Sequence, residues 1–220
     1  MAALRLNDGT WLVWIAGISE VGPWLLSLGH SGVATEIGAL PASLEPGPGQ
    51  ATFALPNLTQ LHAALDRAYK LAVSLPEVPL DRFRARTAGL PRTTEAERTV
   101  IQRIGQDIFR DALIDYWSER CPMTGITERA LLRASHIKPW ADCTDAERLD
   151  VHNGLLLSAL WDAAFDRGLV SFADDGSVLV SPRLGEKERE ALGLAKALPL
   201  QGLGNAHRAN LLFHRNLYGF

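Results

Sequence analysis

The pattern of apolar and polar positions predicts a mixed first part of the chain. Two apolar runs, at 10–18 and 51–57, are typical of buried strands, and a turn rich in Pro and Gly at 41–49 precedes the second. Apolar residues then recur at helical spacing, at positions 58, 61, 65, 69, 72 and 75. We therefore expect strands combined with one amphipathic helix.

Three prolines suggest a break in the chain. Pro76, Pro79 and Pro91 bound a stretch that is interpreted as a linker or an irregular connection. We place the boundary near residue 90, which gives an N-terminal domain at 1–90 and a second domain at 91–220.

A long helix is predicted to open the second domain. Thr94 and Glu97 have the spacing of a capping box, in which each side chain bonds the backbone of the other. An apolar stripe at Val100, Ile101, Ile104, Ile108, Ala112 and Tyr116 continues through Glu119. The turn at 121–125 (CPMTG) ends this helix.

The remaining segments alternate between strands and helices. We expect a strand at 130–140, an acidic loop at 141–152 and a short strand at 153–158. A helix at 158–168 follows, with Ser158 as N-cap and Gly168 as its C-terminal stop. The segments LVSF and SVLVS around ADDG predict a hairpin, and 206–219 predicts a last helix.

Composition excludes several classes of protein. Of 220 residues, 47% are hydrophobic and 21% charged, which favours a globular protein over a disordered one. The N-terminus lacks the pattern of a signal peptide, and no apolar run approaches the ~20 residues that span a bilayer. Only Cys121 and Cys143 are present, so a disulfide framework is excluded. We expect a cytoplasmic protein with no membrane partner.

Net charge alone does not indicate a nucleic-acid partner, because it is −3. Its distribution is uneven: Arg5 is the only basic residue in 1–66, whereas 67–148 carries fourteen basic and twelve acidic residues. The segment 191–220 has Lys196, Arg208 and Arg215 and no acid. A polyanion is expected to meet the middle and the end of the chain, although the same charges also suit solvated helix faces.

Four polar residues lie on the two strands and the helix at 130–168. His136 falls within an apolar strand and Asn153 opens the next, while Asp162 and Asp166 are four apart and share one helix face. A neutral imidazole beside two carboxylates suits a general base next to a hard-cation site. Structural interpretations of the same residues stay open. His136 also suits a core histidine whose ring nitrogens are hydrogen-bonded, and Asn153 suits a turn before Gly154. The two acids also suit a solvated helix face beside Arg167.

The sequence motifs around these four residues occur in an order that resembles a known family. The run CPMTG, LLRASHIKPW and HNGLLLSALWDAAFDRGLVSF is similar to the HNH endonucleases, in the subgroup written SHI-x-PW…NGLLL…D-x-x-FDRGL. The resemblance covers about residues 95–185. It implies an α+β protein. A smaller mixed α/β domain comes first in the chain, and a long helix and then a ββα-metal nuclease domain follow it.

The resemblance also implies roles for individual residues. His136 matches the general base, and Asn153 matches the residue that holds the loop and this histidine in position. Asp162 and Asp166 fall where the family supplies metal ligands. Ser135 stands where other branches of the family place a ligating residue, but its hydroxyl is only a weak ligand. His152 is a second-choice candidate for a metal ligand or a phosphate contact.

Departures from the family pattern change the expected metal. Trp161 stands where many relatives have histidine, so carboxylates must supply the ligands, which suits Mg²⁺ or Mn²⁺ better than Zn²⁺. Neither cysteine belongs to a Cys-x-x-Cys pair, which argues against a structural zinc. The implied reaction is hydrolysis of DNA phosphodiesters to 5′-phosphate and 3′-hydroxyl ends. Contacts to the DNA backbone are expected from Arg110, Arg133, Lys138 and Arg167.

The first ninety residues carry no motif that we can name. Trp11, Trp14, Trp24 and Phe53 are interpreted as core, with an aromatic pocket for a flipped base as the alternative. By analogy with the family, this domain reads DNA in a restriction or defence nuclease; the alternative is a dimerisation module for a homodimer. Two other functions stay open for the whole chain: an inactive or weakly active DNA-binding scaffold, and a nuclease acting on RNA or as a toxin.

Overall fold

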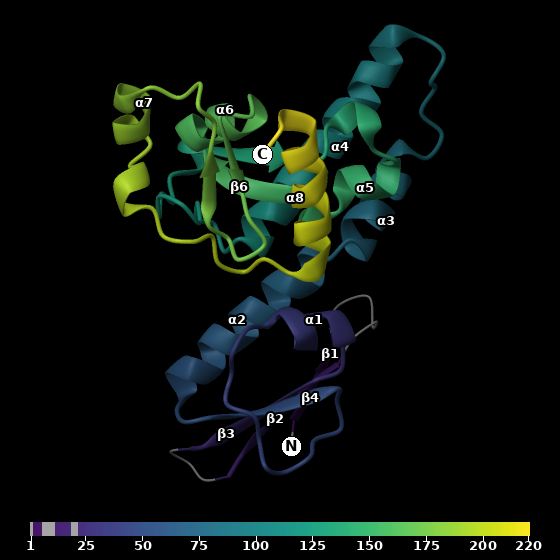
Figure 1. Ribbon diagram of the computed structural model, residues 1–220. Helices are drawn as coiled ribbons and strands as arrows, with labels where there is room; N and C mark the ends of the chain where they lie inside the picture. The colour runs from purple at the N-terminus through teal and green to yellow at the C-terminus, as the bar shows by residue number, and fades with distance from the viewer. Residues whose placement is uncertain (1, 6–11, 19–21) are drawn as a thin grey trace. The chain divides into compact units, whose positions relative to one another are not determined.

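The computed structural model describes residues 2–5, 12–18 and 22–220. The chain divides into two compact units, Met1–Leu75 and Pro76–Phe220 (Figure 1). Both combine helices with antiparallel strands, so the α+β class predicted from the sequence is confirmed.

The first unit is built on a four-stranded antiparallel sheet whose strands are neighbours in chain order. Its elements are β1 (Ala2–Arg5), β2 (Leu12–Gly17), β3 (Trp24–Leu28), α1 (Ser31–Glu36), β4 (Ala51–Leu55) and α2 (Leu58–Ser74). Helix α2 packs against β3 and β4, and Leu26 of β3, Leu55 of β4 and Leu71 of α2 itself are all buried. The two predicted strands and the predicted helix of this part correspond to β2, β4 and α2.

The four aromatic residues that the sequence singles out in this unit fall into three groups. Phe53 belongs to the core, as predicted. Trp14 and Trp24 are half-buried on β2 and β3, and Trp11 lies outside the described residues. The interpretation as core therefore holds for Phe53 and only partly for the two described tryptophans.

The stretch predicted as a linker is instead helix α3 (Glu77–Thr87). Pro79 lies in its first turn, where the missing N–H costs no intrahelical bond. Phe83 and Thr87 follow at intervals of four and are buried, because α3 packs against α4 and α5 of the second unit. The division therefore falls at Leu75–Pro76 rather than near residue 90.

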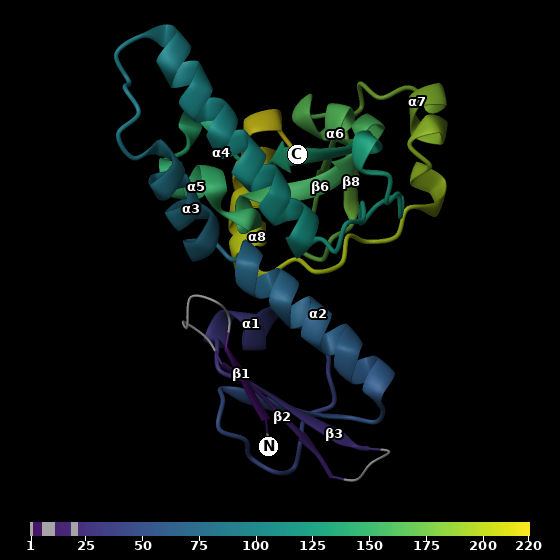
Figure 2. The ribbon, with the colours of Figure 1, turned by 180° about the vertical axis from the view of Figure 1, so that it is seen from behind.

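Helix α4 (Glu95–Tyr116) begins with the predicted capping box. The Glu97 N–H donates to Thr94 Oγ1 over 3.2 Å, and the Thr94 N–H donates to Glu97 Oε2 over 2.9 Å. The apolar stripe is buried from Ile108 onward, whereas Val100 is 51% exposed. Only the second half of α4 therefore belongs to the core. Figure 2 shows the first half of the helix extending beyond the strands of this unit.

A two-stranded antiparallel sheet and one helix form the centre of the second unit. Strands β5 (Leu132–His136) and β6 (Gly154–Ser158) pair so that His136 lies opposite Gly154. Helix α6 (Ala159–Asp166) follows β6 directly and packs against both strands. The connection between the strands, predicted as one acidic loop, contains α5 (Asp145–Leu149) and 3₁₀ turns at 140–142 and 151–153.

The end of the chain wraps around this centre. It comprises the predicted hairpin of β7 (Val170–Phe172) and β8 (Val178–Val180), then α7 (Glu186–Ala191) and α8 (Asn205–Tyr218). Helix α8 packs against β7 and the 151–153 turn. Among the described residues, no helix combines the length and apolar character that crossing a bilayer requires.

Candidate active site

One pocket of about 390 Å³ collects four of the six residues that the sequence predicts to be catalytic or metal-binding. Ser135 and His136 reach it from the end of β5, and Asp162 and Asp166 reach it from α6. Because α6 packs against β5, residues thirty positions apart in the sequence share one wall.

The imidazole of His136 is held on three sides. Its ring stacks on Phe109 of α4 with centroids 3.8 Å apart, and Trp140 meets it edge-on at 5.3 Å. Its Nε2 lies 3.0 Å from the main-chain oxygen of Arg148. Since a carbonyl oxygen only accepts hydrogen bonds, Nε2 carries the proton of the neutral ring, and Nδ1 keeps a lone pair.

The surroundings of His136 favour its neutral form. Burial lowers the pKa of the imidazole below its ordinary value, and the positive charge of Arg148 lowers it further. The hydrogen bond to the Arg148 carbonyl opposes the shift. At neutral pH this ring is therefore a proton acceptor.

Asn153 fastens the connection that carries Arg148. Its side chain is 1% exposed; Oδ1 accepts from the Lys138 N–H over 2.8 Å, and Nδ2 donates to the Glu147 carbonyl over 3.1 Å. A further contact joins Nδ2 to Cys143 Sγ over 3.3 Å. The Ile137 N–H bonds the Asn153 carbonyl over 2.9 Å, so one residue ties both ends of the connection together.

Gly154 lets α4 approach the site closely. A Cβ at this position would lie 2.5 Å from the Phe109 ring and 2.8 Å from Leu113. Any side chain there would displace the ring on which His136 stacks. Gly154, which the sequence also allows as ordinary turn chemistry after Asn153, is thus required by packing.

The two acids of α6 differ in exposure. Asp162 is half-buried, and Asp166 is exposed at the last helical position. Burial raises the pKa of Asp162, a hydrogen bond from Ser135 lowers it, and the nearby charge of Asp166 raises it. The pair forms a region of negative charge beside His136.

The donor set suits a hard cation that keeps part of its water shell. Among the described residues, no group of three or more His, Cys, Asp and Glu side chains converges on one point. The pocket offers two carboxylates and the Ser135 hydroxyl, which are oxygen ligands. Mg²⁺ is commonly held by one or two carboxylates together with water and phosphate oxygens, so these residues fit such an ion and do not fit tetrahedral zinc.

His152 is oriented toward another part of the unit. Its Nδ1 pairs with Asp150 over 2.8 Å, and its ring meets Tyr116 and His207 edge-on at 5.7 and 5.1 Å. The described lining of the pocket around His136 does not include it. The structure therefore does not bring His152, the second-choice ligand, to the other predicted site residues.

The four basic residues predicted to contact DNA differ in the partners that their side chains have within the protein. Arg110 donates to the Leu132 and Arg129 carbonyls, and Arg133 donates to the Ala130 and Leu132 carbonyls. These four bonds measure 2.8–3.0 Å. Lys138 pairs with Glu147 over 2.7 Å. The side chain of Arg167 is 79% exposed and only loosely paired with Asp166, at 3.8 Å.

Three residues that sequence reasoning missed line the same pocket. They are Trp140, His214 and Tyr218, and the last two come from α8. The sequence offered a faint signal, since positions 214 and 218 are four apart in a predicted helix and share a face. Nothing in the sequence indicated which element that face would meet.

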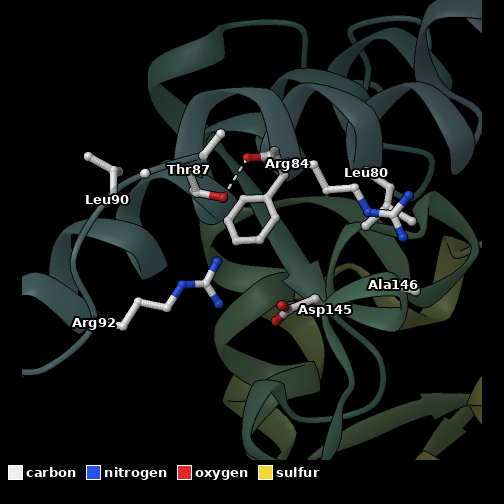
Figure 3. Close-up of a pocket in the computed structure, with 10 residues that line it drawn as sticks. Leu80, Arg84, Thr87, Leu90, Arg92, Asp145 and Ala146 are labelled. Atoms are coloured by element: carbon white, nitrogen blue, oxygen red, sulfur yellow. Dashed lines mark hydrogen bonds between the residues drawn. The ribbon is translucent and has the colours of Figure 1, made fainter.

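A second hollow, of about 380 Å³, lies between α3 and the start of α5. Figure 3 shows Arg84 and Arg92 on either side of it, with Asp145 between them. Asp145 is paired with Arg148 over 3.0 Å. A Cβ at Gly105 would lie 3.1 Å from Trp140 and 3.4 Å from Phe83, so both rings pack close to this position of α4. Trp140 lines the first hollow and Phe83 the second.

Comparison with known proteins agrees with this arrangement. Residues 121–173 match the family model described as HNH endonuclease. The chain therefore contains an HNH endonuclease domain, in which β5, β6 and α6 form the hairpin and helix. The family resemblance predicted from the sequence is confirmed over these residues. No curated protein matches the chain.

Proposed function

We propose that this protein is a metal-dependent endonuclease that hydrolyses phosphodiester bonds of DNA. Membership of residues 121–173 in a family of phosphodiester hydrolases supports nuclease chemistry. The observation that carries the proposal is the pocket in which His136, with Nε2 committed to a carbonyl, shares a wall with Asp162 and Asp166.

The proposed step begins at His136 Nδ1. This atom accepts a proton from a water molecule while the water oxygen forms a bond to phosphorus, and the bond from phosphorus to the 3′ oxygen breaks. The leaving oxygen takes a proton from solvent, which gives 5′-phosphate and 3′-hydroxyl ends. A divalent cation, Mg²⁺ or Mn²⁺, held by Asp162 and Asp166 would neutralise charge on the phosphate and the leaving oxygen.

The roles of the supporting residues follow from their contacts. Asn153 fixes the connection whose Arg148 carbonyl orients His136. Ser135, hydrogen-bonded to Asp162, orients that carboxylate and is at most a weak ligand. His152 serves the packing of α4 and α8 rather than the metal.

Arginines at the second hollow suit contacts to the nucleic-acid backbone. Residues 80–92 carry Arg82, Arg84, Arg86 and Arg92 against Asp81 alone. These arginines are exposed, whereas the guanidinium groups of Arg110 and Arg133 bond backbone carbonyls. We therefore assign phosphate contacts to Arg84, Arg92 and the exposed Arg167, and structural roles to Arg110, Arg133 and Lys138, which is paired with Glu147.

The first unit is proposed to assist the nuclease without gripping DNA strongly. In residues 1–75 the basic residues are Arg5, Arg67 and Lys70, too few for broad phosphate contact. Reading of modified DNA, as in a restriction or defence enzyme, and formation of a homodimer are the two roles proposed for it.

Nicking of a supercoiled plasmid tests the proposal. We expect conversion to the open circle with Mg²⁺ or Mn²⁺ and none with EDTA. Parallel reactions on modified duplex, single strands and RNA define the substrate. Cleavage of RNA alone would replace the DNA assignment, and no cleavage of any substrate with either metal would leave a scaffold protein without this activity.

A further inference from the structure

Helix α8 reaches the pocket from outside the region that matches the nuclease family. It spans Asn205–Tyr218, whereas the match ends at residue 173. His214 and Tyr218, one turn apart, nevertheless line the pocket with His136 and the two acids. The contacts of these two side chains with α6 indicate what α8 contributes.

Both side chains bond main-chain carbonyls at the end of α6. The Tyr218 hydroxyl donates to the Asp166 oxygen over 2.6 Å, and His214 Nε2 donates to the Phe165 oxygen over 3.1 Å. The Ser171 hydroxyl lies 2.9 Å from His214 Nδ1, which fixes the ring from the other side. The His214 ring also stacks on Phe165 with centroids 3.9 Å apart.

The end of α6 is capped in part by the residues that follow it, because the Gly168 N–H bonds the Phe165 carbonyl and the Leu169 N–H bonds the Ala164 carbonyl. The last carbonyls of a helix have no N–H partner within it, and a negative side chain there opposes the helix dipole. Asp166 is the last residue of α6 and carries that unfavourable charge. Without the Tyr218 and His214 donors, we expect this turn to be held less firmly and Asp166 to be less well positioned relative to Asp162.

Gly168 makes room for Tyr218. Its φ of 59° is left-handed, and a Cβ there would overlap the Tyr218 ring. The glycine read from the sequence as a helix stop therefore has a second reason: a side chain would push α8 away from the pocket.

We propose that His214 and Tyr218 are positioning residues that hold the last turn of α6, so that Asp162 and Asp166 bind one divalent cation. This proposal rests on the proposed function. It makes the C-terminal helix part of the active site, although α8 contributes no ligand and no proton.

Tyr218→Phe tests the proposal, because it removes one hydroxyl and keeps the ring. The first readout is calorimetry of Mn²⁺ binding to the full chain without DNA. We expect the Kd to rise about five-fold, the effect of losing one hydrogen bond. The Tyr218 ring is 37% exposed, so water will replace part of the bond. In nicking assays at fixed Mn²⁺, kcat should fall and KM for DNA should stay unchanged.

Two further variants serve as a control and as an independent test of the same contact. Tyr69→Phe, on a half-exposed tyrosine of α2, is the matched control and should leave Mn²⁺ binding and kcat unchanged. Gly168→Ala should weaken Mn²⁺ binding at least as much as Tyr218→Phe, and the double variant should be no worse than Gly168→Ala alone. Amide exchange at Gly168 and Leu169, which bond carbonyls of α6, should speed up in both variants.

The outcomes separate this proposal from the proposed function. If the unaltered protein binds Mn²⁺ and nicks DNA, and Tyr218→Phe binds and nicks equally well, the positioning role is wrong and the nuclease stands. Faster amide exchange with unchanged Mn²⁺ affinity would reduce α8 to a purely structural element. A parent protein that neither binds Mn²⁺ nor nicks would overturn both proposals.

Discussion

The Nε2 atom of His136 lies 3.0 Å from the main-chain oxygen of Arg148, twelve residues further along the chain. This bond sets which ring nitrogen holds the proton and therefore which one is left to accept another. Arg148 is itself anchored, because its Nε donates to the Trp140 carbonyl over 3.0 Å and its guanidinium lies over the Trp140 ring. The proposed base is thus oriented by the connection between β5 and β6.

Activity is predicted to depend on pH through His136. The neutral ring is the active form, and burial lowers its pKa below the ordinary value of about 6.5. The acidic midpoint of the nicking rate should therefore lie below about 6.5. Single-turnover rates at constant Mn²⁺ across pH 4.5–8 measure this, and an acidic midpoint above 6.5 would contradict the assignment.

Replacing Asn153 is predicted to cost stability as well as activity. Asn153→Ala removes a buried side chain and leaves the part-buried Lys138 N–H and Glu147 carbonyl without this partner. We expect a loss of roughly 2–3 kcal/mol in the free energy of unfolding. Urea titration followed by circular dichroism measures it. The matched control is Asn57→Ala, which removes one exposed cap on α2 and should cost about 1 kcal/mol.

The hairpin and helix of the HNH domain could be predicted from the sequence because their signals are local. Apolar strands, a capped helix and the order of His136, Asn153, Asp162 and Asp166 each lie within short windows. The prediction failed at α3, where prolines suggested a linker, because the burial of Phe83 against α4 and α5 outweighs them. His214 and Tyr218 could not be found, since their partners lie more than forty residues away. The hydrogen bonds from Arg110 and Arg133 to main-chain carbonyls could not be predicted from the sequence either.

Stability is predicted to fall in acid through His214. Burial lowers the pKa of this ring to about 4, whereas the unfolded chain takes up the proton near 6.5. Between these values the unfolded state binds more protons, so stability is lost as the pH falls from about 6.5 to 4. The full contribution is at most about 3 kcal/mol. His214→Phe should show a smaller drop between pH 7 and 5 in urea titrations; an equal drop would assign the acid sensitivity elsewhere.

Neutralising two arginines at the second hollow is predicted to weaken DNA binding without changing chemistry. Arg84→Gln combined with Arg92→Gln removes two phosphate contacts, so the slope of log affinity against log salt should become shallower by about 2. Binding is measured by fluorescence anisotropy of a labelled duplex with a His136→Ala background, which prevents cleavage. Lys187→Gln on α7 is the control for loss of surface charge. An unchanged slope in the double variant would remove α3 from the DNA interface.

The rate of plasmid nicking by His136→Ala, compared with the unaltered protein at the same Mn²⁺ concentration, tests the central claim most directly. Removal of a general base should lower the rate about 10²–10⁴-fold. Mn²⁺ affinity and far-ultraviolet circular dichroism should stay unchanged, because the carboxylates of α6 and the fold are retained. Nicking by His136→Ala at the rate of the unaltered protein would contradict the account.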